Sequence, residues 1–166
     1  MLHNVLMIVF PLVVGFAAVT DFLTMTISNK ISIALVVSFC CLAPFTGMTF
    51  QMAGMSVLAA AVLFSIGFAC FAFGWVGGGD VKFASAVALW LGWNHMFDYL
   101  VLFSLYGGFL TIAVLILSRL LEPLPILQVG FLNRFADHRR VPYGIALSIA
   151  ALQIYPTTHW LAGSMN

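Results

Sequence analysis

Long apolar runs separated by short polar stretches dominate the chain. Six of them are candidates for helices that cross a lipid bilayer, a crossing that needs about 20 apolar residues. They cover residues 2–20, 31–45, 52–73, 81–93, 97–118 and 141–160. The second and fourth runs are short, so we expect neighbouring helices to shield them or flanking polar residues to extend them. The pattern predicts an all-α, polytopic membrane protein of about six transmembrane helices.

Composition supports this prediction. Of the 166 residues, 63% are hydrophobic and only 7% are charged, too few to cover the surface of a water-soluble domain. In lipid the backbone can be satisfied only in helices or a closed barrel, and the continuous apolar runs favour helices. The first run lacks the basic segment and cleavage site of a signal peptide, so we interpret it as the first span. We expect one transmembrane domain over residues 1–166 and no soluble domain.

Basic residues predict the orientation in the membrane, because short cytoplasmic loops are enriched in Lys and Arg. With six spans, all of them share one side; they are Lys30, Lys82, Arg119, Arg134, Arg139 and Arg140. We expect this side to be cytoplasmic, with both termini and the turns at 46–51 and 94–95 outside. If run 81–93 only re-enters the membrane and does not cross it, the predicted sides of all later segments are reversed. Segment 119–140 is either an interfacial segment attracted to anionic lipid or an ordinary cytoplasmic loop.

Two carboxylates stand in unusual places. The chain has five in all, namely Asp21, Asp80, Asp98, Glu122 and Asp137. Asp21 directly follows the first run, and Asp80 follows three glycines, Gly77, Gly78 and Gly79. Although 59 positions separate them (80 minus 21), the topology places both at the cytoplasmic membrane boundary. Ionisable residues near spans are costly, which favours a functional interpretation.

Each carboxylate also has a structural interpretation. Asp80 could be the N-cap of the helix that follows, and Asp21 could be a solvated residue beside the membrane. As a pair, they have the chemistry of an aspartic peptidase, in which two close carboxylates share one proton. Glycines beside one carboxylate would let a substrate strand approach, or would serve close helix packing. Lys82 would either stabilise a carboxylate or anchor the chain at the interface.

Three segments resemble one family, the prepilin leader peptidases, which are intramembrane aspartic peptidases with a GxGD motif. The first is the glycine-rich stretch that ends in Asp80, with Lys82 two residues later. The second is Asp21 followed by Ile27-Ser28-Asn29-Lys30, which is similar to the family's first catalytic Asp and its Ile-Pro-Asn turn. Ser28 stands where the family usually has Pro, and the basic residue usual between that Asp and the turn is missing. The third is Val141-Pro142-Tyr143-Gly144, similar to the family's Pro-aromatic-Gly segment.

The resemblance implies an inner-membrane endopeptidase that removes the basic leader from type IV prepilin or pseudopilin precursors at the cytoplasmic face. It implies Asp21 and Asp80 as the catalytic pair. Its supporting or substrate-binding residues would be Gly77, Gly78, Gly79, Lys82, Asn29, Lys30, Pro142, Tyr143 and Gly144. Precursors and membrane lipid are the expected partners, with the pilus assembly machinery as a further one and no nucleic acid.

Length and cysteines refine the resemblance. The compact chain is similar to the single-domain members associated with tight-adherence pili, and it lacks the cysteine-rich insertion of members that also methylate the new N-terminus. We therefore expect cleavage without methylation. Cys40, Cys41 and Cys70 form no CxxC pair, and the four histidines have no metal-ligand spacing, so we expect neither metal nor cofactor.

The residues alone leave two alternative functions open, and they predict which carboxylate of a peptidase pair holds the shared proton. The Asp pair could relay protons or cations in a small transporter or channel subunit, which would place the carboxylates near the bilayer midplane. The chain could instead be a structural subunit of a secretion machine. Within a peptidase pair we expect Asp21 to hold the shared proton, because it follows a helix C-terminus whereas Asp80 precedes a helix N-terminus.

Overall fold

Every apolar run of the sequence contains helix in the computed structural model, which describes residues 2–121 and 141–162. The order is α1 (Leu2–Thr24), α2 (Asn29–Leu42), η1 (Ala43–Phe45), α3 (Phe50–Ala72), α4 (Gly78–Leu91), α5 (Trp93–Leu121), α7 (Tyr143–Ile154), η4 (Tyr155–Thr157) and α8 (His159–Ala162). No strand occurs among these residues. The predicted all-α membrane architecture is therefore confirmed.

Helix length divides the predicted spans into two groups. Among the described residues, three helical segments are long and apolar enough to cross a membrane, Val5–Thr24, Phe50–Ala72 and Trp93–Arg119. Helices α2 and α4 have 14 residues each and α7 has 12. At 1.5 Å per residue, 14 residues reach only about 21 Å of a hydrocarbon core of about 30 Å. The six runs are helical, but only three meet the length of a full span.

Helix α4 forms the centre of the bundle, with α2, α3, α5 and α7 packed around it. Val81 and every residue from Phe83 to Leu91 are buried. A helix that is apolar on all sides is typical of a protein interior. This explains why run 81–93 can be so short. Neighbouring helices shield it, which was one of the two explanations expected for the short runs.

Aromatic side chains hold the helices together in the half of the bundle that contains the chain termini. The Trp90 indole of α4 donates to the Leu35 carbonyl of α2 at 2.9 Å, and Trp160 donates to the Trp90 carbonyl at 2.6 Å. Phe10 of α1 stacks on Tyr155 with ring centroids 4.3 Å apart. Apolar burial drives helix association only weakly in lipid, so such packing and hydrogen bonds position the helices.

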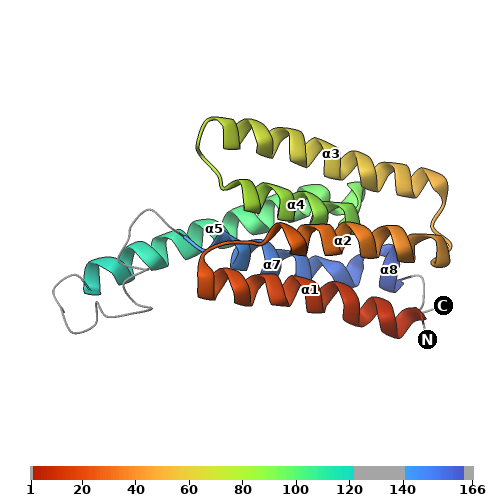
Figure 1. Cartoon of the computed structure of the whole chain (residues 1–166), viewed down its shortest axis with the longest axis horizontal. Helices are drawn as coiled ribbons and strands as arrows, with labels where there is room; N and C mark the ends of the chain where they lie inside the picture. Colours follow the sequence, from red (N-terminus) through yellow and green to blue (C-terminus); the bar gives the residue numbers. More distant parts are fainter. Residues whose placement is uncertain (1, 122–140, 163–166) are drawn as a thin grey trace.

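The opposite end of the bundle gathers three helix ends that are far apart in sequence. The C-terminal end of α1 and the N-terminal ends of α4 and α7 lie at that end, while the start of α1 and helix α8 lie at the other (Figure 1). Helix α1 continues through Asp21 to Thr24, so Asp21 lies in its last turn. The apolar run had predicted that Asp21 follows the helix, and this expectation is wrong. Met25, the first residue after the helix, has a positive φ of 53°.

Candidate functional site

Asp21 is a buried carboxylate at the end of a membrane helix. Its exposure is only 3%, whereas Phe22 beside it is 43% exposed. Its Oδ2 accepts a hydrogen bond from the backbone N–H of Gly144 at 2.7 Å, and the N–H of Ile145 is a second backbone donor. Both donors belong to the first turn of α7, whose free N–H groups favour an anion. The two backbone donors therefore offset part of the cost of burying a negative charge on Asp21.

Asp80 lies in the first turn of α4, outside the three long spans. The N-cap of α4 is Gly77, so the expectation that Asp80 itself caps the helix is wrong by three residues. Its carboxylate accepts instead from the Gly77 backbone, as the third residue of a capping box does. Desolvation, followed by the charge of Asp21, raises the pKa of Asp80 to about 6, while the Gly77 bond acts in the opposite direction. The two carboxylates are thus electrostatically coupled.

The three glycines before Asp80 are crowded by the chain's own atoms. A Cβ on Gly77 would lie 2.7 Å from Asp80 Oδ2, and one on Gly78 would lie 3.2 Å from the Phe71 ring. A Cβ on Gly79 would lie 3.1 Å from the Ile27 carbonyl oxygen. These distances support the close-packing interpretation of the glycines, since the space beside them is already occupied.

Ile27 lies beside residues that neighbour both carboxylates. The sequence analysis did not identify it as a site residue. Its backbone lies against Gly79, next to Asp80. Its Cδ1 would be 2.7 Å from a Cβ on Gly144, the residue whose N–H binds Asp21. The side chain is buried although it belongs to a turn between helices. Its only signal in the sequence was its place in the Ile-Ser-Asn-Lys segment.

Lys82 and Asn29 link the first turns of α4 and α2. Lys82 Nζ donates to Asn29 Oδ1 at 3.1 Å, and both side chains are exposed. The structure therefore pairs Lys82 with an amide. Lys30 is exposed, and its backbone N–H donates to the Ser28 hydroxyl at 3.3 Å. Ser28 caps α2 with φ of −66°, the value that a proline ring would impose, so the departure from Ile-Pro-Asn keeps the same backbone.

Pro142 and Tyr143 position the start of α7. Pro142 is fully buried and is the N-cap residue of that helix. The Tyr143 hydroxyl shares a hydrogen bond of 3.1 Å with Thr111 Oγ1 of α5. These contacts tie α7 to α5, and thereby hold the Gly144 N–H toward Asp21.

Some residues named in the sequence analysis lie outside the part of the chain that the structure describes. Residues 122–140, including Arg134, Arg139, Arg140, Glu122 and Asp137, are outside the described part. Within the part of the chain that the structure describes, no group of three or more His, Cys, Asp or Glu side chains could hold a metal ion.

Comparison with known proteins gives one family match. A family model described as the type IV leader peptidase family matches residues 8–116 of the chain. The matched region includes Asp21, Asp80 and Ile27, and ends before Gly144. No curated protein and no solved structure matches the chain.

Proposed function

Because the chain belongs to the type IV leader peptidase family, we propose that it is an aspartic endopeptidase that removes the basic leader from type IV prepilin-like precursors. Asp21 and Asp80 are its catalytic pair in this proposal. It is a membrane protein with three long apolar helices, and we place it as a multi-pass protein of the bacterial inner membrane. Prepilin or pseudopilin precursors are its substrates, and the pilus assembly machinery is a further partner.

One observation carries the proposal: two carboxylates from distant segments are electrostatically coupled at the same end of the bundle. An aspartic peptidase needs one ionised carboxylate to deprotonate water and one protonated carboxyl to polarise the scissile carbonyl. A relay through the bilayer would instead place the acids near the midplane. The location of the pair at helix ends therefore favours the peptidase over the transporter.

Hydrogen bonding assigns the two roles in the opposite way from the helix-dipole argument. Asp21 accepts from two backbone N–H groups of α7, whereas Asp80 accepts from one backbone group, that of Gly77. We therefore assign the ionised, water-activating role to Asp21 and the shared proton to Asp80. Asp21 removes a proton from water, whose oxygen attacks the carbonyl carbon while Asp80 donates to the carbonyl oxygen. The C–N bond then breaks as the amine takes from Asp21 the proton that came from water, and the carbonyl re-forms as its hydroxyl returns a proton to Asp80.

Co-expression with a candidate prepilin tests the proposal, with loss of the leader followed by gel shift. Cells with the wild-type chain should produce the shorter mature form, and cells with Asp80→Asn should retain the precursor. Asp98→Asn is a matched control, since Asp98 is exposed and lies near the start of α5, at the opposite end of the bundle from the first turn of α4 (Figure 1). An unprocessed precursor in the presence of abundant wild-type protein contradicts the proposed activity.

Orientation is tested separately by cysteine labelling. In a background without Cys40, Cys41 and Cys70, Trp75→Cys and Phe45→Cys place single thiols at exposed aromatic positions on opposite ends of the bundle, at 75% and 72% exposure. We expect an impermeant reagent to label position 45 from outside and position 75 only after the membrane is opened. The reverse pattern would place the carboxylates on the periplasmic face.

We also propose that the protein does not methylate the new N-terminus. A methyl donor of nucleotide type needs a concave pocket with well-placed polar groups, and we find no glycine-rich nucleotide loop in segment 119–140. Mass spectrometry of mature pilin, from cells in which this is the sole processing protein, decides the question. An N-terminus that is heavier by one methyl group, and that depends on this chain, would show the proposal to be wrong.

A further inference from the structure

Tyr99 is a buried tyrosine that the proposed reaction does not use. It belongs to α5, which packs on the central helix α4, and its side chain is fully buried. Its hydroxyl has no hydrogen-bond partner among the described residues. A buried hydroxyl without a partner is costly, because it has given up its bonds to water. Its presence in the core therefore needs a reason other than stability.

The other tyrosines of the chain differ from Tyr99 in this respect. Each bonds its hydroxyl to another helix: Tyr106 to Gln153, Tyr143 to Thr111, and Tyr155 to the Leu6 carbonyl. Ser32 and Ser148 are also buried and unpaired, but a serine hydroxyl lies close to its own helix and can turn to the carbonyl four residues earlier. A tyrosine hydroxyl stands at the far end of its ring and cannot reach its own backbone. Its partner must come from another element.

Asp80 is the polar group on a neighbouring helix that acts on Tyr99. Helices α4 and α5 are joined at Gly92, so α5 runs back along α4 toward its first turn, which contains Asp80 (Figure 1). The Tyr99 hydroxyl interacts electrostatically with the Asp80 carboxylate. That carboxylate accepts from one backbone group, that of Gly77, whereas Asp21 accepts from two. The carboxylate with fewer backbone donors thus lies near a donor that has no acceptor.

The proposed reaction changes the charge of Asp80. Asp80 holds the shared proton in the resting site and becomes a carboxylate when it gives that proton to the scissile carbonyl oxygen. Donors and dipoles stabilise an ionised carboxylate more strongly than a neutral carboxyl. A hydroxyl with no partner is free to turn its hydrogen toward this new charge. An interaction that strengthens as the transition state forms lowers the barrier.

We propose that Tyr99 is a positioning residue for Asp80, and that its hydroxyl turns its hydrogen toward the Asp80 carboxylate as that group gives up its proton. Tyr99 keeps its own proton throughout, so the proton balance of the reaction is unchanged. The inference rests on the proposed function, which assigns the shared proton to Asp80. It explains why an unpaired hydroxyl stays in the core, since the group costs stability at rest and stabilises charge during cleavage.

A test of this role must hold the other titratable groups around Asp80 constant. At that end of the bundle they are Asp21 of α1, Lys30 of α2, Cys70 of α3 and Tyr143 of α7, with Lys82 on α4 itself. The charge of Asp21 acts on Asp80 directly. An Asp21→Asn background removes this coupling, and the remaining groups are the same in both members of a matched pair.

Infrared titration of the Asp80 carboxyl tests the proposal without any cleavage. The pair is Asp21→Asn with and without Tyr99→Phe, and the protonated-carboxyl band of Asp80 is identified by its loss when Asp80→Asn is added. Phenylalanine cannot stabilise the ionised carboxylate, so the pKa of Asp80 should rise by about half a unit or more. Tyr155→Phe in the same background is the control and should leave this pKa unchanged, because its hydroxyl bonds the Leu6 carbonyl at 2.9 Å.

Kinetics and stability of the active protein give two further measurements. Tyr99→Phe should lower kcat about three- to tenfold with KM within about twofold, because the hydroxyl acts on the charge that develops after substrate is bound. The pH at which the rate falls should move upward, since Asp80 then keeps its proton to a higher pH. The melting temperature should stay the same or rise, because an unpaired buried hydroxyl is removed. Tyr155→Phe should keep kcat and the pH profile but lower the melting temperature.

The outcomes separate the role of Tyr99 from the activity. A raised pKa of Asp80 in Tyr99→Phe, with no loss of stability, supports the role even if the wild-type chain fails to cleave, a result that would contradict the proposed function alone. An unchanged or lowered pKa of Asp80 overturns the proposal. A fall in kcat without a shift of the pH profile also overturns it, as does a melting temperature lowered as far as in Tyr155→Phe, because either result would assign Tyr99 to packing.

Discussion

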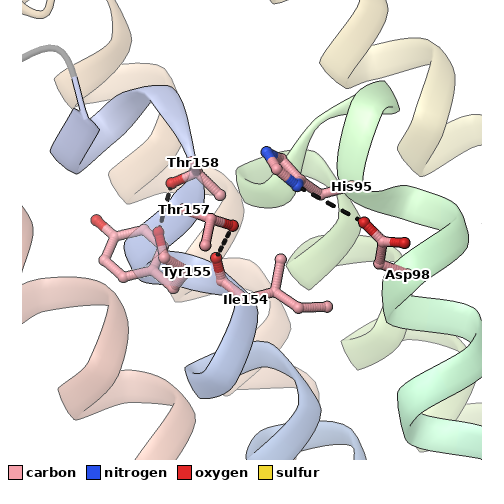
Figure 2. A network of polar contacts seen from close by, with 6 residues as sticks. All are labelled: His95, Asp98, Ile154, Tyr155, Thr157 and Thr158. Atoms are coloured by element: carbon pink, nitrogen blue, oxygen red, sulfur yellow. Dashed lines mark hydrogen bonds and ion pairs between the residues drawn. The ribbon is translucent and has the colours of Figure 1, made fainter.

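Acidic side chains at the two ends of the bundle differ in how the fold treats them. At one end Asp21 is buried and accepts from the backbone of Gly144 at 2.7 Å. At the other, Asp98 is 65% exposed and its Oδ2 lies 4.0 Å from His95 Nδ1 (Figure 2). The nearby threonine hydroxyls bond within their own turn: Thr157 donates to the Ile154 carbonyl at 2.8 Å and Thr158 to the Tyr155 carbonyl at 2.7 Å.

The difference shows which carboxylates the fold is built around. An exposed pair at 4.0 Å contributes little to stability, because water and ions screen it. A buried carboxylate needs donors supplied by the fold, and α7 supplies them to Asp21 across 123 residues of sequence. The Asp98 carboxylate therefore needs no donor from another helix, whereas the surroundings of Asp21 and Asp80 depend on several segments at once.

The largest expected effect is loss of the carboxylates themselves. Asp21→Asn and Asp80→Asn should each lower the cleavage rate by at least about 10³-fold, because either change removes one half of a proton-sharing unit. The double variant should be no slower than the slower single variant. Leader loss on a gel, with protein abundance measured by immunoblot, gives the rates.

Asp98→Asn is the matched control for this comparison. It should stay within about twofold of wild type, because its exposed pair with His95 contributes little. A rate for either Asp21→Asn or Asp80→Asn that is close to that of Asp98→Asn would remove that residue from the catalytic pair.

The next effect concerns the backbone donor to Asp21. In Gly144→Ala the added Cβ would lie 2.7 Å from Asp21 Oδ2 and 2.7 Å from Ile27 Cδ1, so the carboxylate or the turn must move. We expect the cleavage rate to fall by about 10²-fold, the scale of a misplacement of about 1 Å in an active site. Gly108→Ala is the control, since nothing lies within 4 Å of its added Cβ. Equal rates for the two variants would show that Asp21 tolerates displacement.

The difference between the two ends could be predicted only in part. The number of apolar runs and the positions of the basic residues predicted that Asp21 and Asp80 lie on one side of the membrane, because both can be read from the sequence alone. The central position of α4 could not be inferred, since hydropathy is the same for a helix in protein and a helix in lipid. Ile27 was missed for a related reason: its neighbours Gly79 and Gly144 come from α4 and α7, and no local spacing records such contacts.

A smaller effect is expected from pH. The raised pKa of Asp80, about 6, means that its carboxyl keeps the shared proton up to that pH and loses it above. With both carboxylates ionised the carbonyl cannot be polarised, so the cleavage rate should fall as pH rises through about 6, by about tenfold for each further unit. Initial rates between pH 5 and 8 in detergent measure it, with Asp98→Asn showing the same profile. A rate that rises over this interval would contradict the assigned roles.

The smallest effect should come from the exposed bridge between Lys82 and Asn29. Lys82→Met and Asn29→Ala each remove one hydrogen bond of 3.1 Å, and each should lower the cleavage rate by about fivefold or less. Because both changes break the same contact, the double variant should fall no further than either single variant. A double-mutant cycle on initial rates makes the comparison. If Lys82→Met were slower than Asn29→Ala by about 10²-fold or more, Lys82 would act on a carboxylate or the substrate directly, and the bridge to Asn29 would be secondary.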